Sequence, residues 1–155
     1  YMVPAFTGLG APHWDSHARG AIVGITRDTG IAHLVRAALE AVCFQSRELI
    51  EAMIADSGKS ITKLRADGGM VVNHWLLQFL SDILNVEVEQ PKVIETTALG
   101  AAFLAGLQHG IYQSTAEIAV LWQKQHHFSP EMDSAQRQQL AAEWERAINR
   151  VKNQG

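Results

Sequence analysis

The stretch Ile61-Thr62-Lys63-Leu64-Arg65-Ala66-Asp67-Gly68-Gly69 decides the fold that we predict for this chain. Residues 61–66 are typical of a short strand, and the Asp-Gly-Gly that follows is typical of a tight turn. Residues 72–84 then carry apolar side chains at helical spacing, and Asn85 can end that helix. A strand, a glycine turn and a helix in this order predict one unit of an α/β fold.

The chain before this unit contains two predicted strands and a long predicted helix. Residues 1–6 and 20–26 are the strands, and the second is expected to be buried because it is an apolar run bounded by glycine. Residues 31–54 are the helix, which Asp28 or Thr29 would cap and Gly58 would end.

The chain after this unit continues the alternation. Residues 86–89 are a predicted half-exposed strand that stops before Pro91, and residues 97–108 are a predicted helix. Ser114 opens a short helix and Asp133 a final amphipathic one, with a flexible joint expected between them at residues 123–132. Strands that alternate with helices imply right-handed crossovers and an α/β sheet.

The composition is that of an ordinary globular chain. Its 155 residues are 47% hydrophobic and 19% charged, with a formal net charge of −3, which excludes a strongly basic nucleic-acid-binding surface. No apolar run approaches the roughly 18 residues that a membrane-spanning helix needs. Cys43 is the single cysteine, which fits a reducing compartment and a cytoplasmic location.

The first residues, Tyr1-Met2-Val3-Pro4, lie inside a predicted strand. The chain does not open with a methionine, a polar tail or a helix cap. We therefore expect a fragment of a longer protein, and a processed N-terminus is the alternative.

The candidate ligand site is Asp67-Gly68-Gly69 together with Asn73, because ligands of open α/β sheets gather at the carboxyl ends of strands. Glycine lets a ligand approach the backbone, and a following helix offers N–H groups to an anion. Asn73 is placed to bond a ribose, a base edge or a phosphate. A plain strand-to-helix turn explains the same residues equally well. The phosphate-loop and dinucleotide-fold glycine motifs are absent.

Other candidate groups point to packing. Residues 96–102 are mostly small, which favours close contact between a helix and its neighbour. None of the seven histidines has a partner at metal-ligand spacing, and Cys43 lies among apolar helix residues. The residues alone therefore indicate a nucleotide or phosphate cradle without an identifiable catalytic or metal-binding group.

Three motifs in order resemble those of the FGGY carbohydrate kinases. Residues 20–25 and 33–40 resemble the family's second signature, residues 64–69 with Asn73 its adenosine motif, and residues 97–102 its second connecting helix. The loop at residues 4–12, with Trp14 and Asp15, resembles the members that phosphorylate glycerol. The sequence departs from the usual pattern at His13 and at residues 70–72, which removes no group with an assigned role.

This resemblance implies a ribonuclease-H-like, actin-type ATPase fold in an incomplete C-terminal domain with flanking helices. Residues 1–128 would be that domain without its opening strands, and residues 129–155 a helical tail packed on it. The full enzyme would transfer the γ-phosphoryl group of MgATP to glycerol, giving sn-glycerol 3-phosphate. It would form dimers or tetramers.

The resemblance also assigns the site residues. Gly69 and Asn73 match positions near the α-phosphate and the adenine of ADP, Gly68 shapes the turn, and Asp67 organises it with ligand contact as a second role. The catalytic aspartate, the glycerol contacts and the N-terminal domain lie upstream in the family, so this chain alone should be inactive. No metal ligand is assigned here.

Two alternatives stay open. The first is a kinase of the same family that acts on a pentulose or gluconate, since the discriminating pocket residues lie outside this chain. The second is a structural or interaction module that binds no ligand by itself, because a sheet opened at one edge can self-associate.

Overall fold

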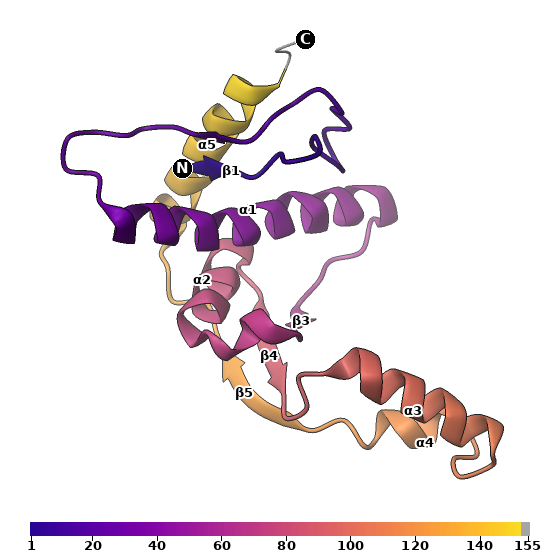
Figure 1. The fold of residues 1–155 in the computed structure, drawn as a ribbon. Coiled ribbons are helices and arrows are strands. Elements are labelled where there is room, and N and C mark those ends of the chain that lie inside the picture. The colour runs from indigo at the N-terminus through magenta and orange to yellow at the C-terminus, as the bar shows by residue number, and fades with distance from the viewer. Residues whose placement is uncertain (153–155) are drawn as a thin grey trace.

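The computed structural model describes residues 1–152, and the α/β class predicted from the sequence is confirmed (Figure 1). In chain order the elements are β1 (Met2–Val3), β2 (Ala21–Ile22), α1 (Ile31–Ser57), β3 (Lys63–Arg65), the short 3₁₀ helix η1 (Gly69–Val72), α2 (His74–Leu84), β4 (Glu87–Pro91), α3 (Thr96–Gln108), α4 (Thr115–Ala119), β5 (Lys124–Phe128) and α5 (Ser134–Val151). Within residues 1–152 no helix is long and apolar enough to span a membrane.

Three strands form the sheet that carries the glycine turn. Its order is β3-β4-β5, with β3 parallel and β5 antiparallel to the central β4. β4 was predicted as half-exposed and ending before Pro91, and both expectations are wrong, because residues 88–91 are buried and the strand includes Pro91. The irregular pairing between Gln90 and Pro91 lets the sheet accept a residue without an N–H group.

The predicted flexible joint at residues 123–132 is also wrong. Residues 124–128 form β5, and the segment after it is held by Asp82 of α2. The Asp82 carboxylate accepts backbone N–H bonds from Glu131 at 2.7 Å and Met132 at 3.2 Å. The polar composition that indicated a joint belongs to an outer strand whose backbone is paired.

The strands β1 and β2 form a separate two-stranded antiparallel sheet. Only Met2 and Val3 of the predicted first strand are strand, and the second was wrongly predicted as buried, since the side chain of Ile22 is 43% exposed. The apolar run at residues 20–26 has no layer on its outer side within the described chain.

Some of the predicted helix ends agree with the structure and others do not. Gly58 and Asn85 end α1 and α2 in the left-handed conformation, as predicted, with φ of 65° and 56°. Asp28 and Thr29 do not cap α1. The cap is Gly30, whose N–H donates to the Nδ1 atom of His33 at 3.1 Å.

The core lies where α1, α2 and α5 meet. Phe44 of α1 stacks on Trp144 of α5, with ring centres 5.0 Å apart, and meets the edge of Phe79 of α2 at 5.7 Å. α5 also packs against β1, so its apolar face closes the core on the side away from the three-stranded sheet. The domain division at residue 128 stays a prediction, and residues 153–155 of the proposed tail lie outside the described residues.

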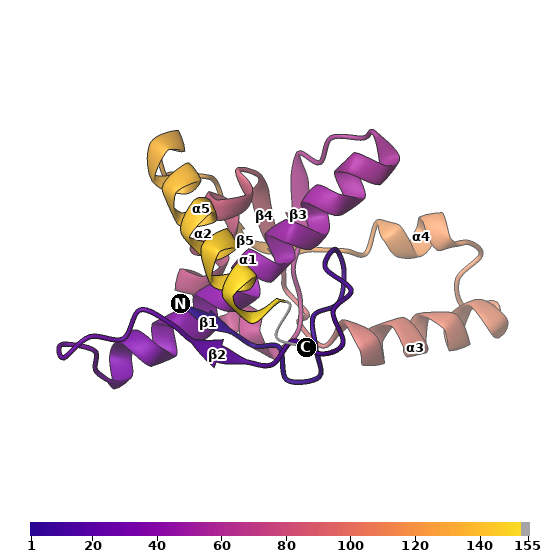
Figure 2. The ribbon, with the colours of Figure 1, turned by 90° about the horizontal axis from the view of Figure 1, so that it is seen from above.

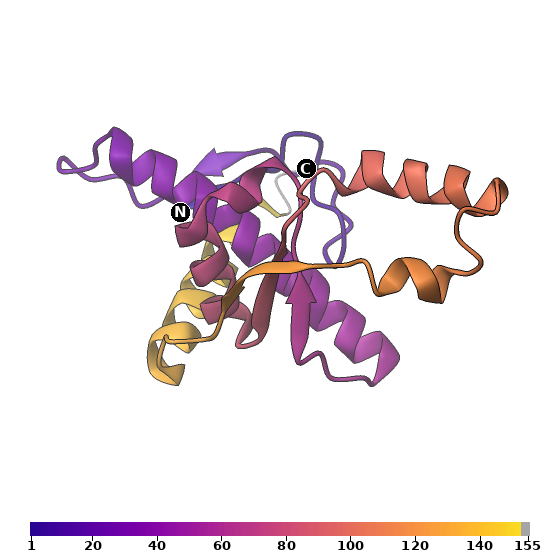
Figure 3. The same cartoon turned by 90° about the horizontal axis from the view of Figure 1, so that it is seen from below.

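The helices α3 and α4 form an arm that projects from the rest of the chain (Figure 2). Seen from below, the arm extends to one side of the three-stranded sheet (Figure 3). Large apolar side chains are exposed along it, including Leu104, Ile111 and Val120 at 69%, 69% and 78%.

Candidate functional site

Asp67, Gly68 and Gly69 follow β3 at its carboxyl end, as predicted. Gly68 has φ 88° and ψ 178°, a region of backbone conformation that is essentially restricted to glycine. Its N–H donates to the carbonyl of Ile94 at 3.0 Å, which ties the turn to the chain that follows β4. Gly68 is therefore required by the shape of the turn.

Gly69 is not required in the same way. It begins η1, and its φ does not lie in the positive range that favours glycine. A Cβ atom built at Gly69 would meet no atom of the chain within 4 Å. The chain's own atoms thus leave open space at Gly69, where a ligand can approach the backbone closely.

Asp67 is held by a residue that the sequence reasoning did not assign to the site. Its Oδ2 atom accepts a short hydrogen bond from the hydroxyl of Thr96, the first residue of α3. This bond joins the end of β3 to the start of α3 and supports the predicted organising role of Asp67. The sequence placed Thr96 in a small-residue motif, but it gave no signal that the hydroxyl would reach back 29 positions.

Asn73 is the N-cap of α2. Its Oδ1 atom accepts the backbone N–H of Leu76 at 3.2 Å, so α2 begins at His74 and not at residue 72 as predicted. The tighter η1 turn, which begins at Gly69, takes the place of the α-helical turn expected directly behind the glycines. The cap already engages this oxygen, and the other group that Asn73 can offer a ligand is its amide NH2, a donor.

A hollow of about 410 Å³ lies beside Asn73 between α1 and α2. It is lined by Ala32, Val35, Arg36, Leu39, Asn73 and Trp75. The guanidinium of Arg36 lies 5.3 Å from the centre of the Trp75 ring and also donates to Glu40 at 2.7 Å. Of the four predicted site residues, Asn73 lines this hollow and the three residues of the turn do not.

A buried carboxylate on β4 pairs with cations of β3, the strand that leads into the glycine turn. The side chain of Glu89 on β4 is only 4% exposed and lies among cations from both neighbouring strands, with Lys63 Nζ at 2.8 Å and Lys124 Nζ at 3.4 Å. The hydrogen bond from Lys63 holds the pKa of Glu89 below its usual range. Arg65 adds a contact at 3.6 Å and places its guanidinium over the ring of Trp122. Charges thus connect all three strands.

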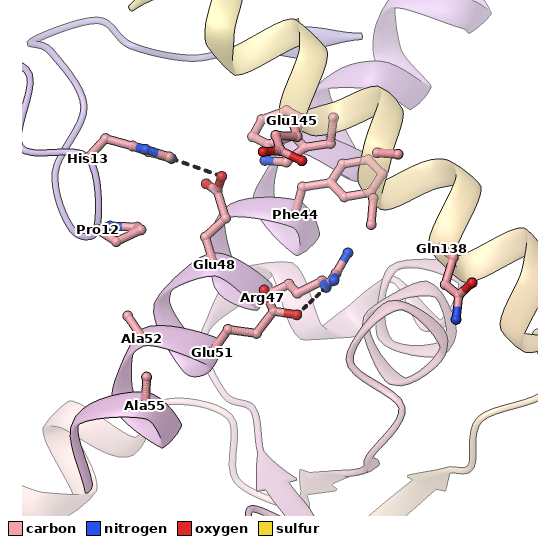
Figure 4. A pocket seen from close by; sticks show the side chains of 13 residues that line it. Pro12, His13, Phe44, Arg47, Glu48, Glu51, Ala52, Ala55, Gln138 and Glu145 are labelled. Carbon is pink, nitrogen blue, oxygen red and sulfur yellow. Dashed lines mark hydrogen bonds and ion pairs between the residues drawn. The ribbon is translucent and has the colours of Figure 1, made fainter. Parts of the chain in front are cut away.

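A second hollow, of about 640 Å³, lies between α1, α5 and the loop at residues 10–14 (Figure 4). His13 of the loop faces Glu48 of α1, with Nε2 and Oε1 2.9 Å apart, and Arg47 donates to Glu51 at 2.7 Å. These groups already pair with one another, and no residue of the predicted site lines this hollow. Sequence spacing could not reveal the His13–Glu48 pair, which joins residues 35 positions apart.

A metal site with three protein ligands and thiol chemistry both lack support in the described part of the chain. Across residues 1–152 no three His, Cys, Asp or Glu side chains gather closely enough to hold a metal ion. Cys43 is 1% exposed, and burial raises the pKa of its thiol to about 12. Its side chain is part of the core, as predicted.

Comparison with known proteins assigns the family. A model of the C-terminal domain of the FGGY family of carbohydrate kinases matches residues 1–109. The whole chain is 56% identical to a glycerol kinase of Ectopseudomonas mendocina, of which it covers 31%.

Two solved structures share the fold over 99% of this chain and 31% of their own. One is a Plasmodium falciparum glycerol kinase with ADP, at 41% identity and a TM-score of 0.85. The other is a ligand-bound xylulose kinase from Lactobacillus acidophilus, at 27% identity and a TM-score of 0.82. The chain therefore spans less than a third of the length of these relatives. It belongs to the FGGY family of carbohydrate kinases and corresponds to their C-terminal domain.

Proposed function

We propose that this chain is the nucleotide-binding C-terminal part of an enzyme that transfers the γ-phosphoryl group of MgATP to glycerol. The observation that carries the proposal is the 56% identity to a glycerol kinase along all 155 residues. The 27% identity to the xylulose kinase, over nearly the same length, favours glycerol over a pentulose as the substrate.

The role proposed for the site is to bind and orient the nucleotide. Gly69 would let the α-phosphate approach the backbone, because the space beside it is open. Asn73 would donate its amide N–H to an acceptor on the adenine, since the cap occupies its oxygen. Gly68 and Asp67 would hold the turn through Ile94 and Thr96.

Catalysis would depend on residues outside this chain. Phosphoryl transfer needs in-line positioning, charge neutralisation and a group that orients the attacking hydroxyl. Bound Mg²⁺ would neutralise charge on the phosphates, but the described residues offer no cluster to hold it, and we assign it to none of them. The base and the glycerol contacts would lie in the upstream part, so the chain alone would be inactive. We also propose a cytoplasmic homo-oligomer.

The experiment is a substrate panel with the full-length protein. Production of ADP from MgATP would be measured with glycerol, xylulose and gluconate under the same conditions. We expect the highest kcat/KM with glycerol. Turnover of xylulose or gluconate without turnover of glycerol would refute the assigned substrate and support the alternative, a kinase of the same family that acts on a pentulose or gluconate.

Binding is measured separately by calorimetric titration of MgADP into the same protein. A saturable signal is expected, with affinity lowered by Gly69→Ala. If the full-length kinase is active on glycerol and its affinity for MgADP is unchanged by this substitution, the proposed site is wrong although the activity is right.

A further inference from the structure

Two histidines that are far apart in the sequence lie side by side in the fold. The imidazole rings of His74 and His126 have their centres 4.5 Å apart and are inclined to each other by 56°. His74 is the first residue of α2, and His126 lies in β5, which packs against α2 (Figure 1). The side chain of His74 is exposed and that of His126 is half-buried. Both rings can therefore be reached from solvent, and the proposed nucleotide site uses neither.

The backbone at both histidines is fixed. The side chain of Asn73 caps the helix that begins at His74, and the ring of Phe128 lies 5.7 Å from the ring of His74. The backbone of His126 is paired with that of Gln90 on the central strand β4. Because neither segment has to be ordered first, a ligand that binds between the rings loses little affinity to conformational entropy.

The separation of the two rings suits one metal ion bound to both. An imidazole nitrogen binds a transition metal at about 2.0–2.1 Å, which places the ion about 3.2 Å from the ring centre. Two imidazoles at 90° around one ion then have their centres about 4.5 Å apart, and two at the tetrahedral angle about 5.2 Å apart. The separation of 4.5 Å in this chain therefore matches the 90° arrangement. Copper(II) and nickel(II) favour that arrangement with nitrogen ligands.

An unpaired acceptor lies beside His126. Gln90 is its cross-strand partner, and the side chains of such partners lie on the same face of the sheet, with Cβ atoms about 4.5–5.5 Å apart. Gln90 is 4% exposed, and its Oε1 atom has no hydrogen-bond partner in the described chain. A histidine that binds a metal through one ring nitrogen commonly donates the N–H of the other nitrogen to a carbonyl or carboxylate. The Oε1 atom of Gln90 can accept such a bond and orient His126.

These ligands do not suit the magnesium ion of MgATP. Magnesium prefers oxygen ligands, and the start of a helix carries a partial positive charge that disfavours a cation held by charge alone. A transition metal instead forms bonds to the imidazole nitrogens. Water can complete its coordination, so the pair does not need the third protein ligand that residues 1–152 do not supply.

We propose that His74 and His126 form a surface site for one divalent transition-metal ion of the nickel or copper type. Both imidazoles bind the ion, and water occupies its other positions. The bound ion ties the first residue of α2 to β5. The proposal is independent of the nucleotide and the substrate assigned to the chain.

The first test is calorimetric titration of NiCl2 into the full-length protein, prepared without a histidine tag. His74→Gln and His126→Gln should each weaken binding at this site at least about tenfold. His127→Gln is the matched control, because His127 is the next residue of β5 but points to the opposite face, where its Nε2 atom lies 3.5 Å from Glu87. It should bind Ni²⁺ as the wild type does. Unchanged binding in His74→Gln and His126→Gln would overturn the proposal.

The second test locates the ion by modification of the imidazoles with diethyl pyrocarbonate, followed by mass spectrometry. With Ni²⁺ at about ten times its Kd, modification of His74 and His126 should slow about tenfold, because a bound nitrogen cannot react. The rate at His127 should not change. Equal slowing at all three histidines would indicate unspecific binding and overturn the proposal.

Two further measurements exclude trivial outcomes. Without metal, His74→Gln and His126→Gln should keep Tm within about 2 °C of the wild type, so that lost binding does not reflect unfolding. Without metal, both rings should react with diethyl pyrocarbonate. Failure of both to react would show that the full-length protein covers the pair, and the proposal would then be wrong.

Discussion

Asn73 has two roles that a single substitution to alanine cannot separate. Its side-chain oxygen caps α2, and the proposed nucleotide contact uses the amide nitrogen of the same side chain. Asn73→Ala removes both groups. The loss of an N-cap costs about 1 kcal/mol, which corresponds to a Tm lower by about 2–4 °C for a domain of this size. A weaker affinity for ADP in this variant could thus come from a frayed helix.

Asn73→Ser separates the two roles. Serine caps a helix about as well as asparagine, so the stability should stay within about 0.5 kcal/mol of the wild type. Serine has no NH2 group at that reach, and the hydrogen bond to the nucleotide would be lost. A hydrogen bond contributes about 0.5–1.5 kcal/mol, so Kd for MgADP should rise about 2- to 13-fold. Asn73→Asp keeps the cap as well and should weaken binding further, because a carboxylate accepts hydrogen bonds and would face the acceptor on the adenine.

The assay pairs thermal unfolding with calorimetric titration of MgADP in the full-length protein. The expected pattern is a lower Tm for Asn73→Ala alone and weaker binding for all three variants. Asn73→Ser with the stability and the ADP affinity of the wild type would refute the nucleotide contact. If Asn73→Ser and Asn73→Asp are as unstable as Asn73→Ala, the capping argument is refuted.

The other predictions concern the turn, the core and the buried thiol. Gly68→Ala should cost about 1–3 kcal/mol in urea unfolding because its φ is 88°, whereas Gly69→Ala should stay within about 0.5 kcal/mol. Phe44→Ala should cost about 3–5 kcal/mol by the same measurement, since Phe44 is 1% exposed and stacked on Trp144. Because the pKa of Cys43 is raised to about 12 in the folded chain, its thiol loses the proton at a lower pH in the unfolded chain than in the folded one. Stability should therefore fall between about pH 9 and pH 12, and a pH series of Tm should lose this slope in Cys43→Ala.

The local features of the fold were predictable from short stretches of sequence. The strand, the glycine turn and the helix around Asp67 were expected, as were Gly58 and Asn85 at the ends of their helices. These depend on the conformational preferences of a few neighbouring residues. The start of α2 was misplaced because the tight η1 turn and an α-helix have similar patterns over four residues.

The predictions that were wrong concern features that depend on contacts between residues far apart in the sequence. The residues of β5 look like a polar joint, and they become a strand only because the unpaired edge of β4 is beside them. The burial of Glu89 likewise depends on Lys63 and Lys124 arriving from two other strands. An alternating pattern predicted that strand as half-exposed, because one strand's sequence cannot report what covers its second face.

For the candidate site, the sequence by itself indicated the backbone segment at which we propose that a ligand binds. Only glycine suits the conformation at Gly68, whereas the open space beside Gly69 depends on the surrounding fold, because a Cβ atom built there would meet no atom within 4 Å. The tertiary structure alone decided which atoms remain available there. It engages the oxygen of Asn73 at the start of α2 and the Oδ2 atom of Asp67 with Thr96, because the hydrogen bonds that a side chain makes depend on which groups the folded chain places beside it.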